Sequence, residues 1–413
     1  MSDKTVIYYD AVIIGGGAAG LMCAVLTKKF NSELKVCIAE AQDRVGRKLL
    51  VTGNGRCNLT NLHITPEMYH GSFSYCVKEL LCNCPPQKII EIFEEMGLMT
   101  TQDSEGRVYP LSKQANSVLD TLRKTSVRYG VDTITSCKVT DITHHKGKYS
   151  LRTDKGKILA NKIIIATGSK ASPATGANDS MLRVLEGMGH TIIPASPSLC
   201  PVTVKSPYLK SLKGVRVTAR VSIIAGDRII KEEVGELQFA ENALSGICVF
   251  NLSRIANTFK DTTIKVSLLP QLNDEELFSK LKHKALLMCD YENAEELLVG
   301  YFHKMVGIAL LKESGISPAD SIRNISDDKI EALAKAINNW NFTVVPHGDF
   351  SKAQVAAGGV SGREIDMHTM ESLLHKNLYI IGEATDCDGD CGGMNLQFAF
   401  SSAYAAAKDI SKL

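Results

Sequence analysis

The segment DAVIIGGGAAGLMCAVLTKKF, which begins at Asp10, constrains the fold of this chain more than any other. Its first residues are mostly apolar and predict a short strand. Gly15, Gly17 and Gly20 then fit the spacing G-x-G-x-x-G, and the residues that follow predict a helix. A second apolar run, KVCIAE, predicts another strand that ends at Glu40. This order predicts a βαβ unit that binds a dinucleotide.

Each glycine of this motif, and the acid after it, has a physical role. Gly15 permits a tight turn, Gly17 lets the backbone approach a pyrophosphate, and Gly20 allows close packing of helix on sheet. The helix N-terminus offers unpaired N–H groups to the phosphates. Glu40 follows the second strand, where a carboxylate binds both ribose hydroxyls and disfavours a 2′-phosphate. The ligand is the ADP half of either FAD or NAD.

The next stretch, AQDRVGRKLLVTGNGRCNLTN, bears on that choice. A plain NAD dehydrogenase would continue with alternating strands and helices. Here the chain instead forms a loop rich in glycine, asparagine and arginine. Such a loop either approaches a ligand closely, with charge and amide donors, or is an ordinary solvated connection.

GRKLLVTGNGRCNLTN resembles the signature of a bacterial family of FAD-dependent oxidoreductases, which includes aminoacetone oxidases and the 3-dehydro-bile acid Δ4,6-reductase. Three further stretches resemble motifs of this family in the same order: EGRVYPLSKQA, IIIATGS, and AAGGVSGREIDMHTMES with LYIIGEATDCDGDCGGMNLQFAFSSAYAAA. The matches span nearly the whole chain. The resemblance implies an α/β fold with a Rossmann-type FAD-binding domain built from both chain ends.

The resemblance also implies FAD-binding residues in the first half of the chain. These are Gly15, Gly17, Ala18, Ala19, Gly20, Glu40, Arg47, Lys48, Asn54, Asn58, Val139, Thr167 and Gly168. The first five would hold the pyrophosphate, Glu40 the adenosine ribose, and Val139 the adenine through its backbone. Thr167 and Gly168 would close over the pyrophosphate, and the remaining four would line the path toward the flavin ring.

The C-terminal stretch GEATDCDGDCGGMNLQ, which begins at Gly382, first suggests a metal loop. Its three aspartates fit the first ligand positions of a calcium loop. The sixth position should be glycine but is Cys391, and the twelfth should be glutamate but is Gln397. Zinc would need a second cysteine pair at matching spacing to complete Cys387 and Cys391. We therefore predict no metal site.

A flavin site explains the same stretch better. Gly382 permits a close approach of the backbone, and Glu383 and Asp386 would face the ribityl and diphosphate region. A helix begins near Asn395 and Leu396, and its free N–H groups would face the pyrimidine edge of the flavin, where reduced flavin is negative. Met394 and Ala403 depart from the residues usual in the family.

The middle of the chain predicts an insertion. From residue 196 the sequence is rich in strands, with turns at Gly214 and Gly226. Three later segments with acidic first turns each predict one helix: NDEELFSKLKHKALLM, NAEELLVGYFHKMVGIALLKESG and SDDKIEALAKAINNW. We expect an FAD-binding domain over 1–190 and 353–413, an inserted β-barrel-like domain over 191–270, a helical subdomain over 271–340, and a return strand of the β-rich domain over 341–352. Such an insertion builds a substrate-facing surface, or its helices only cover the barrel.

The resemblance favours NAD(P)H-driven reduction of a conjugated C=C in a 3-oxo steroid or bile-acid-like substrate, with NADH or NADPH as transient co-substrate. Candidate catalytic residues are Arg56, as a carbonyl or carboxylate anchor, and Tyr109, as a proton donor; both have purely structural alternatives. Rival functions are an aminoacetone-type oxidase that produces hydrogen peroxide, a flavin redox sensor, and an RNA-modification flavoprotein.

Charge and composition bear on partners and location. Lys+Arg 47 against Asp+Glu 45 leave a net charge of +2, so we expect a small-molecule substrate and no nucleic-acid partner, which would need clustered cations. The apolar run AVIIGGGAAGLMCAVL contains three consecutive glycines, follows Asp10, and is too short to span a membrane. The twelve cysteines are scattered, as free thiols of a cytoplasmic protein are. The oligomeric state is left open.

Overall fold

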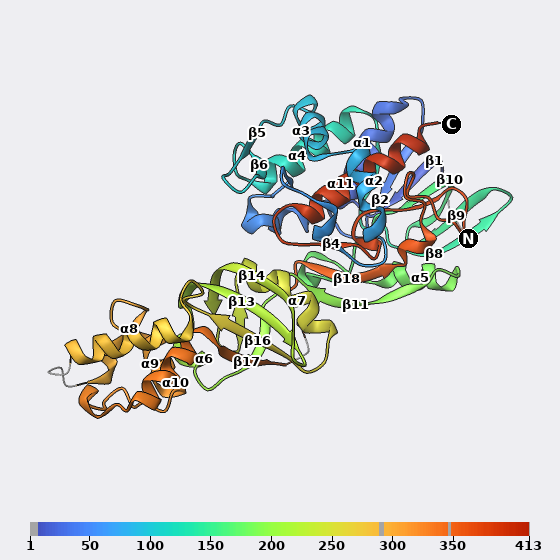
Figure 1. The fold of residues 1–413 in the computed structure, drawn as a ribbon. Coiled ribbons are helices and arrows are strands. Elements are labelled where there is room, and N and C mark those ends of the chain that lie inside the picture. Colours follow the sequence, from blue (N-terminus) through green and yellow to red (C-terminus); the bar gives the residue numbers. More distant parts are fainter. Residues whose placement is uncertain (1–6, 289–292, 346–347, 413) are drawn as a thin grey trace. The chain divides into compact units, whose positions relative to one another are not determined.

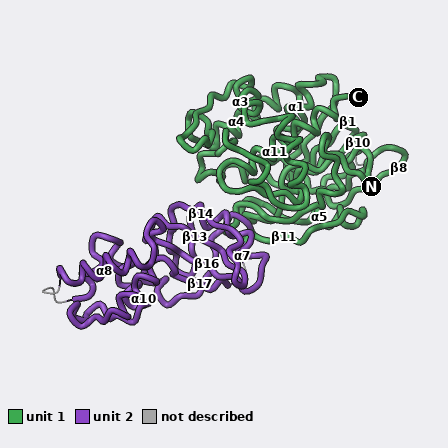
Figure 2. Tube along the Cα trace, in the orientation of Figure 1, with its two compact units in different colours: residues 1–197, 350–413 green, residues 198–349 purple. Residues whose placement is uncertain are grey.

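The computed structural model describes residues 7–288, 293–345 and 348–412, and the chain divides into two compact units. Unit 1 contains residues 1–197 and 350–413, and unit 2 contains residues 198–349 (Figure 2). Each unit has its own cluster of buried apolar side chains. The two ends of the chain therefore build one unit together, and the middle of the chain builds the other.

A seven-stranded sheet lies at the centre of unit 1, in the order β7-β2-β1-β10-β9-β8, with β19 also paired to β10. Its strands are β1 (Ile7–Ile14), β2 (Val36–Ala39), β7 (Asp132–Ile134), β8 (Val139–His145), β9 (Lys148–Thr153), β10 (Gly156–Ile165) and β19 (Leu378–Ile380). Strands β7, β2, β1, β10 and β19 run parallel, whereas β9 and β8 form an antiparallel hairpin.

Strand β10 connects the two kinds of pairing. Its first half pairs with β9, and its second half, Ile163–Ile165, pairs with β19 from the C-terminal part of the chain. From Ile158 to Ile165, β10 also pairs with β1, where Ile13 lies opposite Ile164. The inner strands are continuous apolar runs because parallel strands are covered on both faces.

The α-helices of unit 1 pack beside this sheet or on one another (Figure 1). They are α1 (Ala18–Phe30), α2 (Val77–Asn83), α3 (Pro86–Glu95), α4 (Ala115–Arg128), α5 (Ser180–Gly187) and α11 (Met394–Ile410). The blue α1 and the red α11 pack against each other, although they come from opposite ends of the chain. Both helices carry buried small side chains, such as Ala19, Ala24, Ala403 and Ala406. Small residues allow such helices to approach closely.

Short elements complete unit 1. The small strands are β3 (Thr60–Asn61), β4 (Tyr69–His70), β5 (Thr100–Gln102), β6 (Arg107–Pro110), β11 (Ile192–Ser198), β18 (Val355–Val360) and β20 (Asp388–Gly389). They form three sheets, β3-β6-β5, β11-β18 and β20-β4. The 3-10 helices are η1 (Leu49–Gly55), η2 (Pro66–Met68), η3 (Ser74–Cys76), η4 (Pro173–Thr175), η7 (Gly362–Glu364) and η8 (Gly382–Ala384).

Unit 2 is built around a closed barrel in the order β12-β15-β14-β13-β16-β17, whose neighbouring strands pair antiparallel. The strands are β12 (Val202–Lys205), β13 (Arg216–Ala225), β14 (Arg228–Phe239), β15 (Ala243–Ser245), β16 (Thr262–Ser267) and β17 (Trp340–Val344). The helices are α6 (Leu209–Leu212), α7 (Ile247–Thr258), α8 (Asp274–Leu287), η5 (Ala294–Leu298), α9 (Lys304–Glu313), η6 (Ile322–Asn324) and α10 (Asp327–Asn338). Trp340, Phe239 and Phe342 fill its core with mutually tilted rings.

The predicted fold class is confirmed: a Rossmann-type domain built from both chain ends carries a barrel and a set of helices between its halves. Two details differ. Residues 192–198 form β11, which pairs with β18 in unit 1, so the first unit extends to Pro197 rather than to residue 190. The barrel and helices form one compact unit, and Pro346 and His347 of the expected return segment lie outside the described residues.

One predicted helix is divided. The segment NAEELLVGYFHKMVGIALLKESG was expected to be a single helix, but it forms η5 and α9. Gly300 has φ +84° between them, a conformation that favours glycine and ends a helix. His303 then caps α9 by accepting a hydrogen bond from the N–H of Met305 at 3.2 Å.

Candidate flavin site

The three glycines of the first loop have three different environments. Gly15 has φ +105°, and a Cβ placed on it would lie 2.5 Å from the carbonyl oxygen of Ala166. A Cβ on Gly20 would lie 2.0 Å from the carbonyl oxygen of Gly15. A Cβ on Gly17 would have no atom within 4 Å. Gly15 and Gly20 are therefore required by the fold, whereas the space beside Gly17 is open to a ligand.

This open space lies at the N-terminus of α1. Gly17 is the N-cap residue, and it has no side chain to pair with the first turn. The N–H groups of Ala18, Ala19 and Gly20 precede the first intrahelical hydrogen bond, in which Leu21 donates to Gly17 at 3.0 Å. Free N–H groups at a helix N-terminus attract anions. The arrangement suits a pyrophosphate.

Glu40 is fixed in position after β2. Its Oε2 accepts a hydrogen bond from the N–H of Gly16 at 2.7 Å, and its Oε1 accepts one from the N–H of Gln42 at 2.7 Å. A carboxylate oxygen can accept more than one hydrogen bond, so both retain capacity for ribose hydroxyls. The backbone carbonyl of Glu40 also accepts from the N–H of Cys137, which brings the start of β8, and thus Val139, beside this end of the sheet.

Thr167 and Gly168 follow β10 directly. The Oγ1 atom of Thr167 is buried and has no hydrogen-bond partner. Gly168 has φ +67°, so the chain turns sharply here. This turn lies beside the residues that follow β1, because the Cα of Thr167 lies 3.1 Å from the Cβ position on Gly15. The turn between β10 and η4 therefore faces the same region as the N-terminus of α1.

Glu383 brings the two halves of unit 1 together. Its Oε2 accepts from Nζ of Lys48 at 2.6 Å, and its Oε1 accepts from Oγ of Ser169 at 2.7 Å and from the N–H of Ala356 at 3.0 Å. The neighbouring Gly382 has φ +61°, and a Cβ on it would lie 2.9 Å from the Cβ of Ala19. Glu383 thus makes three protein contacts and orients Lys48.

Several buried polar atoms of unit 1 have no hydrogen-bond partner. Among the described residues, six buried side-chain oxygens have no hydrogen-bond partner, and four of them belong to Asn58, Thr167, Thr385 and Asp386. Asp386 is 3% exposed, and only its Oδ2 has a hydrogen bond, from the N–H of Ser72 at 2.7 Å. A buried polar group without a partner costs about 1–3 kcal/mol. A ligand rich in hydroxyl and imide groups, as FAD is, fits these acceptors.

Other predicted contacts are used within the protein. Asn395 Oδ1 accepts from the N–H of Gly389 at 2.9 Å, and its Nδ2 donates to the carbonyl of Gly389 at 2.8 Å. Leu396 packs against the apolar core. Arg47 donates to Oε1 of Gln42 at 2.9 Å and to the carbonyl of Ala174 at 3.3 Å. Their side chains therefore shape the site from within the protein.

The loop after Lys48 carries the remaining candidates. Asn54 is exposed, with φ +55°. The guanidinium of Arg56 lies over the ring of Tyr109, 5.2 Å from its centroid. Tyr109 is only 7% exposed, and burial raises the pKa of its hydroxyl, against the opposing effect of Arg107 and Arg56. The hydroxyl is therefore protonated at neutral pH, as a proton donor must be.

The acids of the C-terminal stretch occupy separate positions. Asp388 lies in β20, which pairs with β4, and Asp390 accepts a hydrogen bond from Nε2 of His70 at 3.0 Å. Among the described residues, no group of three or more histidine, cysteine, aspartate or glutamate side chains could hold a metal ion. The acids that suggested a metal loop are thus distributed over different protein contacts.

Sequence reasoning missed several residues here. Ser72, Ser169 and Thr385 were not among the predicted site residues, yet Ser72 and Ser169 bind the site carboxylates and the hydroxyl of Thr385 has no partner. Thr385 stands inside the quoted C-terminal stretch, so its position could have drawn attention. Ser72 gives no such signal, because only the fold brings it to Asp386.

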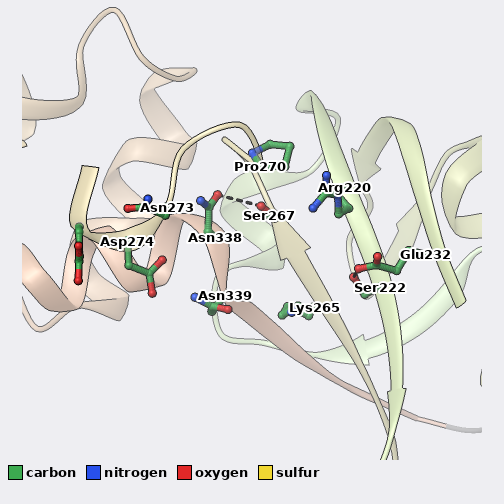
Figure 3. Close-up of a pocket in the computed structure, with 11 residues that line it drawn as sticks. Arg220, Ser222, Glu232, Lys265, Ser267, Pro270, Asn273, Asp274, Asn338 and Asn339 are labelled. Atoms are coloured by element: carbon green, nitrogen blue, oxygen red, sulfur yellow. Dashed lines mark hydrogen bonds between the residues drawn. The ribbon is translucent and has the colours of Figure 1, made fainter. Parts of the chain in front are cut away.

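A hollow of about 650 Å³ lies entirely within unit 2 (Figure 3). Its lining is polar: Arg220, Ser222, Glu232, Lys265, Ser267, Pro270, Asn273, Asp274, Glu275, Asn338 and Asn339. Asn338 accepts from Oγ of Ser267 at 2.9 Å, the bond drawn in the figure. A mainly polar lining does not suit the ring system of a steroid.

The sequence of this chain is similar to those of known proteins. The model of the HI0933-like protein Rossmann domain matches residues 9–409. A 3-dehydro-bile acid delta(4,6)-reductase of Clostridium scindens is 34% identical over 400 residues, which cover 96% of this chain and 97% of that protein. A ribosomal RNA dihydrouridine synthase of Haemophilus influenzae is 30% identical, with 98% and 99% of the two chains covered.

A solved structure has the same fold. The 3-ketosteroid-delta4-(5alpha)-dehydrogenase of Rhodococcus jostii RHA1 gives a TM-score of 0.51 at 11% identity and covers 100% of this chain and 99% of its own. The relative named for RNA modification leaves the expected absence of a nucleic-acid partner without support, since that expectation rested only on net charge and the lack of clustered cations. None of the helices in the described residues is long and apolar enough to cross a membrane.

Proposed function

The chain belongs to the HI0933-like family of Rossmann-domain proteins and is an FAD-dependent oxidoreductase, and from this premise we propose that it reduces a carbon–carbon double bond conjugated to a carbonyl group. The first substrate class is a 3-oxo steroid or bile acid, with NADH or NADPH as the electron donor. The observation that carries this proposal is the 34% identity to the bile-acid reductase over nearly the full length of both proteins.

The buried acceptors support the cofactor part of the proposal. FAD would be held by the open space at Gly17, the N–H groups of α1, and the unpaired oxygens of Asn58, Thr167 and Asp386. Lys48, oriented by Glu383, would place a positive charge beside it. When bound, FAD supplies hydride transfer, which no amino-acid side chain provides.

Tyr109 and Arg56 would serve the substrate. Reduction of a conjugated enone adds a hydride at the β-carbon and a proton at the α-carbon, and Oη of Tyr109 would donate that proton. The raised pKa keeps this hydroxyl protonated. Arg56, which lies over the same ring, would bind the substrate's carbonyl or carboxylate. A charge-assisted hydrogen bond to that oxygen favours the enolate that forms during the reaction.

Uridine in ribosomal RNA is the second candidate substrate. The 30% identity to a ribosomal RNA dihydrouridine synthase favours it. The double bond of uracil is also conjugated to a carbonyl, so the same proposed chemistry serves both substrates. The two candidates differ in size and charge rather than in reaction type.

An anaerobic experiment tests the proposal. The FAD-loaded protein is mixed with NADH or NADPH, and the reduced protein is then mixed with a 3-oxo-4-ene steroid or with unmodified ribosomal RNA. Bleaching of the flavin by a nicotinamide, followed by reoxidation with the steroid, supports the first candidate; reoxidation with RNA and formation of dihydrouridine supports the second. Bleaching only by aminoacetone, with hydrogen peroxide on admission of air, contradicts both.

A further inference from the structure

The segment Gly389–Gly393, here called the glycine loop, leads into α11. Gly392 has φ +123° and Gly393 has φ +113°, and both values favour glycine. A Cβ on Gly393 would lie 2.6 Å from the carbonyl carbon of Thr60 in β3. The path of the glycine loop is therefore fixed closely against the N-terminal half of unit 1.

Hydrogen bonds hold the glycine loop at both ends. Asn395 binds both the N–H and the carbonyl of Gly389. Nδ2 of Asn61 donates to the carbonyl of Gly392 at 3.2 Å, and the hydroxyl of Tyr69 donates to the carbonyl of Met394 at 3.0 Å. These bonds are all between neutral groups.

The centre of the loop is held by a charged residue. Asp390 donates its N–H to the carbonyl of Met68 at 2.9 Å, and its Oδ1 accepts from Nε2 of His70 at 3.0 Å. The two side chains are 16% and 29% exposed. Strand pairing brings them together, because His70 lies opposite Asp388. A hydrogen bond to a carboxylate is stronger than one between neutral groups, and partial burial limits its screening.

The end of the glycine loop faces an unsatisfied polar atom. Oδ1 of Asn58 is buried without a partner and lies 3.1 Å from the Cβ position on Gly393. Gly393 is the N-cap of α11 and has no side chain to pair with the first turn. The free N–H groups of α11 and an unpaired carbonyl oxygen thus lie together at the end of the glycine loop, as the imide edge of a flavin requires.

We propose that His70 is a positioning residue for the flavin: through Asp390 it holds the glycine loop, and with it the first N–H groups of α11, where they stabilise the reduced cofactor. The inference rests on FAD binding and not on the identity of the substrate. A helix N-terminus favours the negative charge of reduced flavin only while its N–H groups remain in place. A loosened loop therefore weakens binding of reduced flavin more than binding of oxidised flavin.

The test compares His70→Ala, which removes the donor, with His70→Gln, which keeps an N–H donor. Asp390→Asn removes the charge. Glu364→Gln is the matched control, because it alters another histidine–carboxylate bond of unit 1, from Nδ1 of His190 to Oε2 of Glu364 at 3.1 Å. The full-length FAD-loaded protein is used, with measurement of the flavin midpoint potential and of amide hydrogen exchange across residues 388–397.

We expect His70→Ala and Asp390→Asn to weaken the preference for reduced flavin roughly tenfold, which lowers the two-electron potential by about 30 mV. Exchange across the glycine loop should accelerate, and His70→Gln should recover part of both effects. Glu364→Gln should leave both unchanged even if it lowers thermal stability. Equal shifts in the control and the test variants, or an unchanged potential with faster exchange, would overturn the inference.

The two proposals fail in different ways. A protein that binds FAD but reduces no enone or uridine defeats the proposed function, while the potential and exchange measurements still decide the role of His70. Should His70→Ala not fold, the milder His70→Gln and Asp390→Asn variants give the same comparison against Glu364→Gln. If neither shifts the potential relative to that control, the inference is wrong.

Discussion

Gly17 and Gly20 stand three residues apart, yet an added methyl group meets open space at the first and the backbone of Gly15 at the second. Gly17→Ala should therefore fold normally and lose FAD affinity roughly tenfold, which is about 1.4 kcal/mol. Gly20→Ala should lower the free energy of unfolding by about 1–3 kcal/mol through overpacking. Titration with FAD and urea unfolding of the apo-protein separate the two effects. A normal FAD affinity in Gly17→Ala would contradict the assignment of the pyrophosphate to this space.

A second prediction concerns the single residue Tyr109. Tyr109→Phe removes the proposed proton donor and should lower the rate of enone reduction about 10²-fold, while flavin reduction by the nicotinamide is unchanged. Because burial raises the pKa of Tyr109 above its ordinary value of 10.0, the wild-type rate should remain constant up to that pH and fall only above it, as the hydroxyl ionises. Stopped-flow rates of each half-reaction measure this. Tyr75→Phe, at a residue 63% exposed in the same unit, is the control.

At the scale of elements, His190 connects the end of α5 to η7 and the segment before β19. It donates from Nδ1 to Glu364, and its Nε2 accepts from Oγ of Ser372 at 3.1 Å. The order serine, histidine, carboxylate resembles a hydrolytic triad. However, Oγ of Ser372 also accepts from the N–H groups of Leu374 and His375, and Ser372 is 5% exposed. The hydroxyl oxygen of Ser372 is therefore neither accessible to a substrate nor free to act as a nucleophile. The three side chains instead connect elements of the fold.

This buried histidine predicts how stability depends on pH. Burial lowers the pKa of His190, and the neighbouring Glu364 only partly opposes that effect. The unfolded chain therefore binds this proton at a higher pH than the folded protein does, so the free energy of unfolding should fall as the pH decreases from about 7 through the folded pKa. Urea unfolding at pH 8 and pH 5.5 measures the change.

His190→Gln is the variant for this prediction. It should cost about 1–3 kcal/mol at pH 8, because partners are left unsatisfied, and it should reduce the dependence on pH below 7. His144→Gln changes an exposed histidine in β8 and should leave the wild-type dependence intact. A wild-type slope in His190→Gln would show that other groups cause the acid sensitivity.

Sequence patterns at this scale predicted elements better than side-chain partners. The apolar period and acidic first turn predicted α8, which begins at Asp274 with a capping box from Asn273. The spacing of Gly15, Gly17 and Gly20 also predicted a different role for each glycine. The partner of Asp386, by contrast, is Ser72, more than 300 residues earlier in the chain. Local periodicity carries no information on such a contact, since it depends on how distant elements pack.

At the scale of the whole molecule, every residue proposed to bind FAD lies in unit 1. Strands β11 and β18, which adjoin the boundaries with unit 2, pair with each other inside unit 1. A shortened chain in which a Gly/Ser linker of about six residues replaces residues 198–349 should therefore fold and bind FAD with an affinity close to that of the full chain. Flavin fluorescence and equilibrium titration measure it. An apo-protein that folds without binding FAD would contradict the assignment of all cofactor contacts to unit 1.

The pairing of β10 with β19 has a consequence for the synthesis of the protein on the ribosome. Its second half pairs with β19, which is translated roughly 200 residues later, on the order of 10–40 s at ordinary elongation rates. Until then the edge of β10 and the face of α1 that later contacts α11 have no native cover. Unpaired strand edges invite association between nascent chains. Because the proposed FAD site includes residues of this later segment, the site can be complete only after β19 and α11 have been translated.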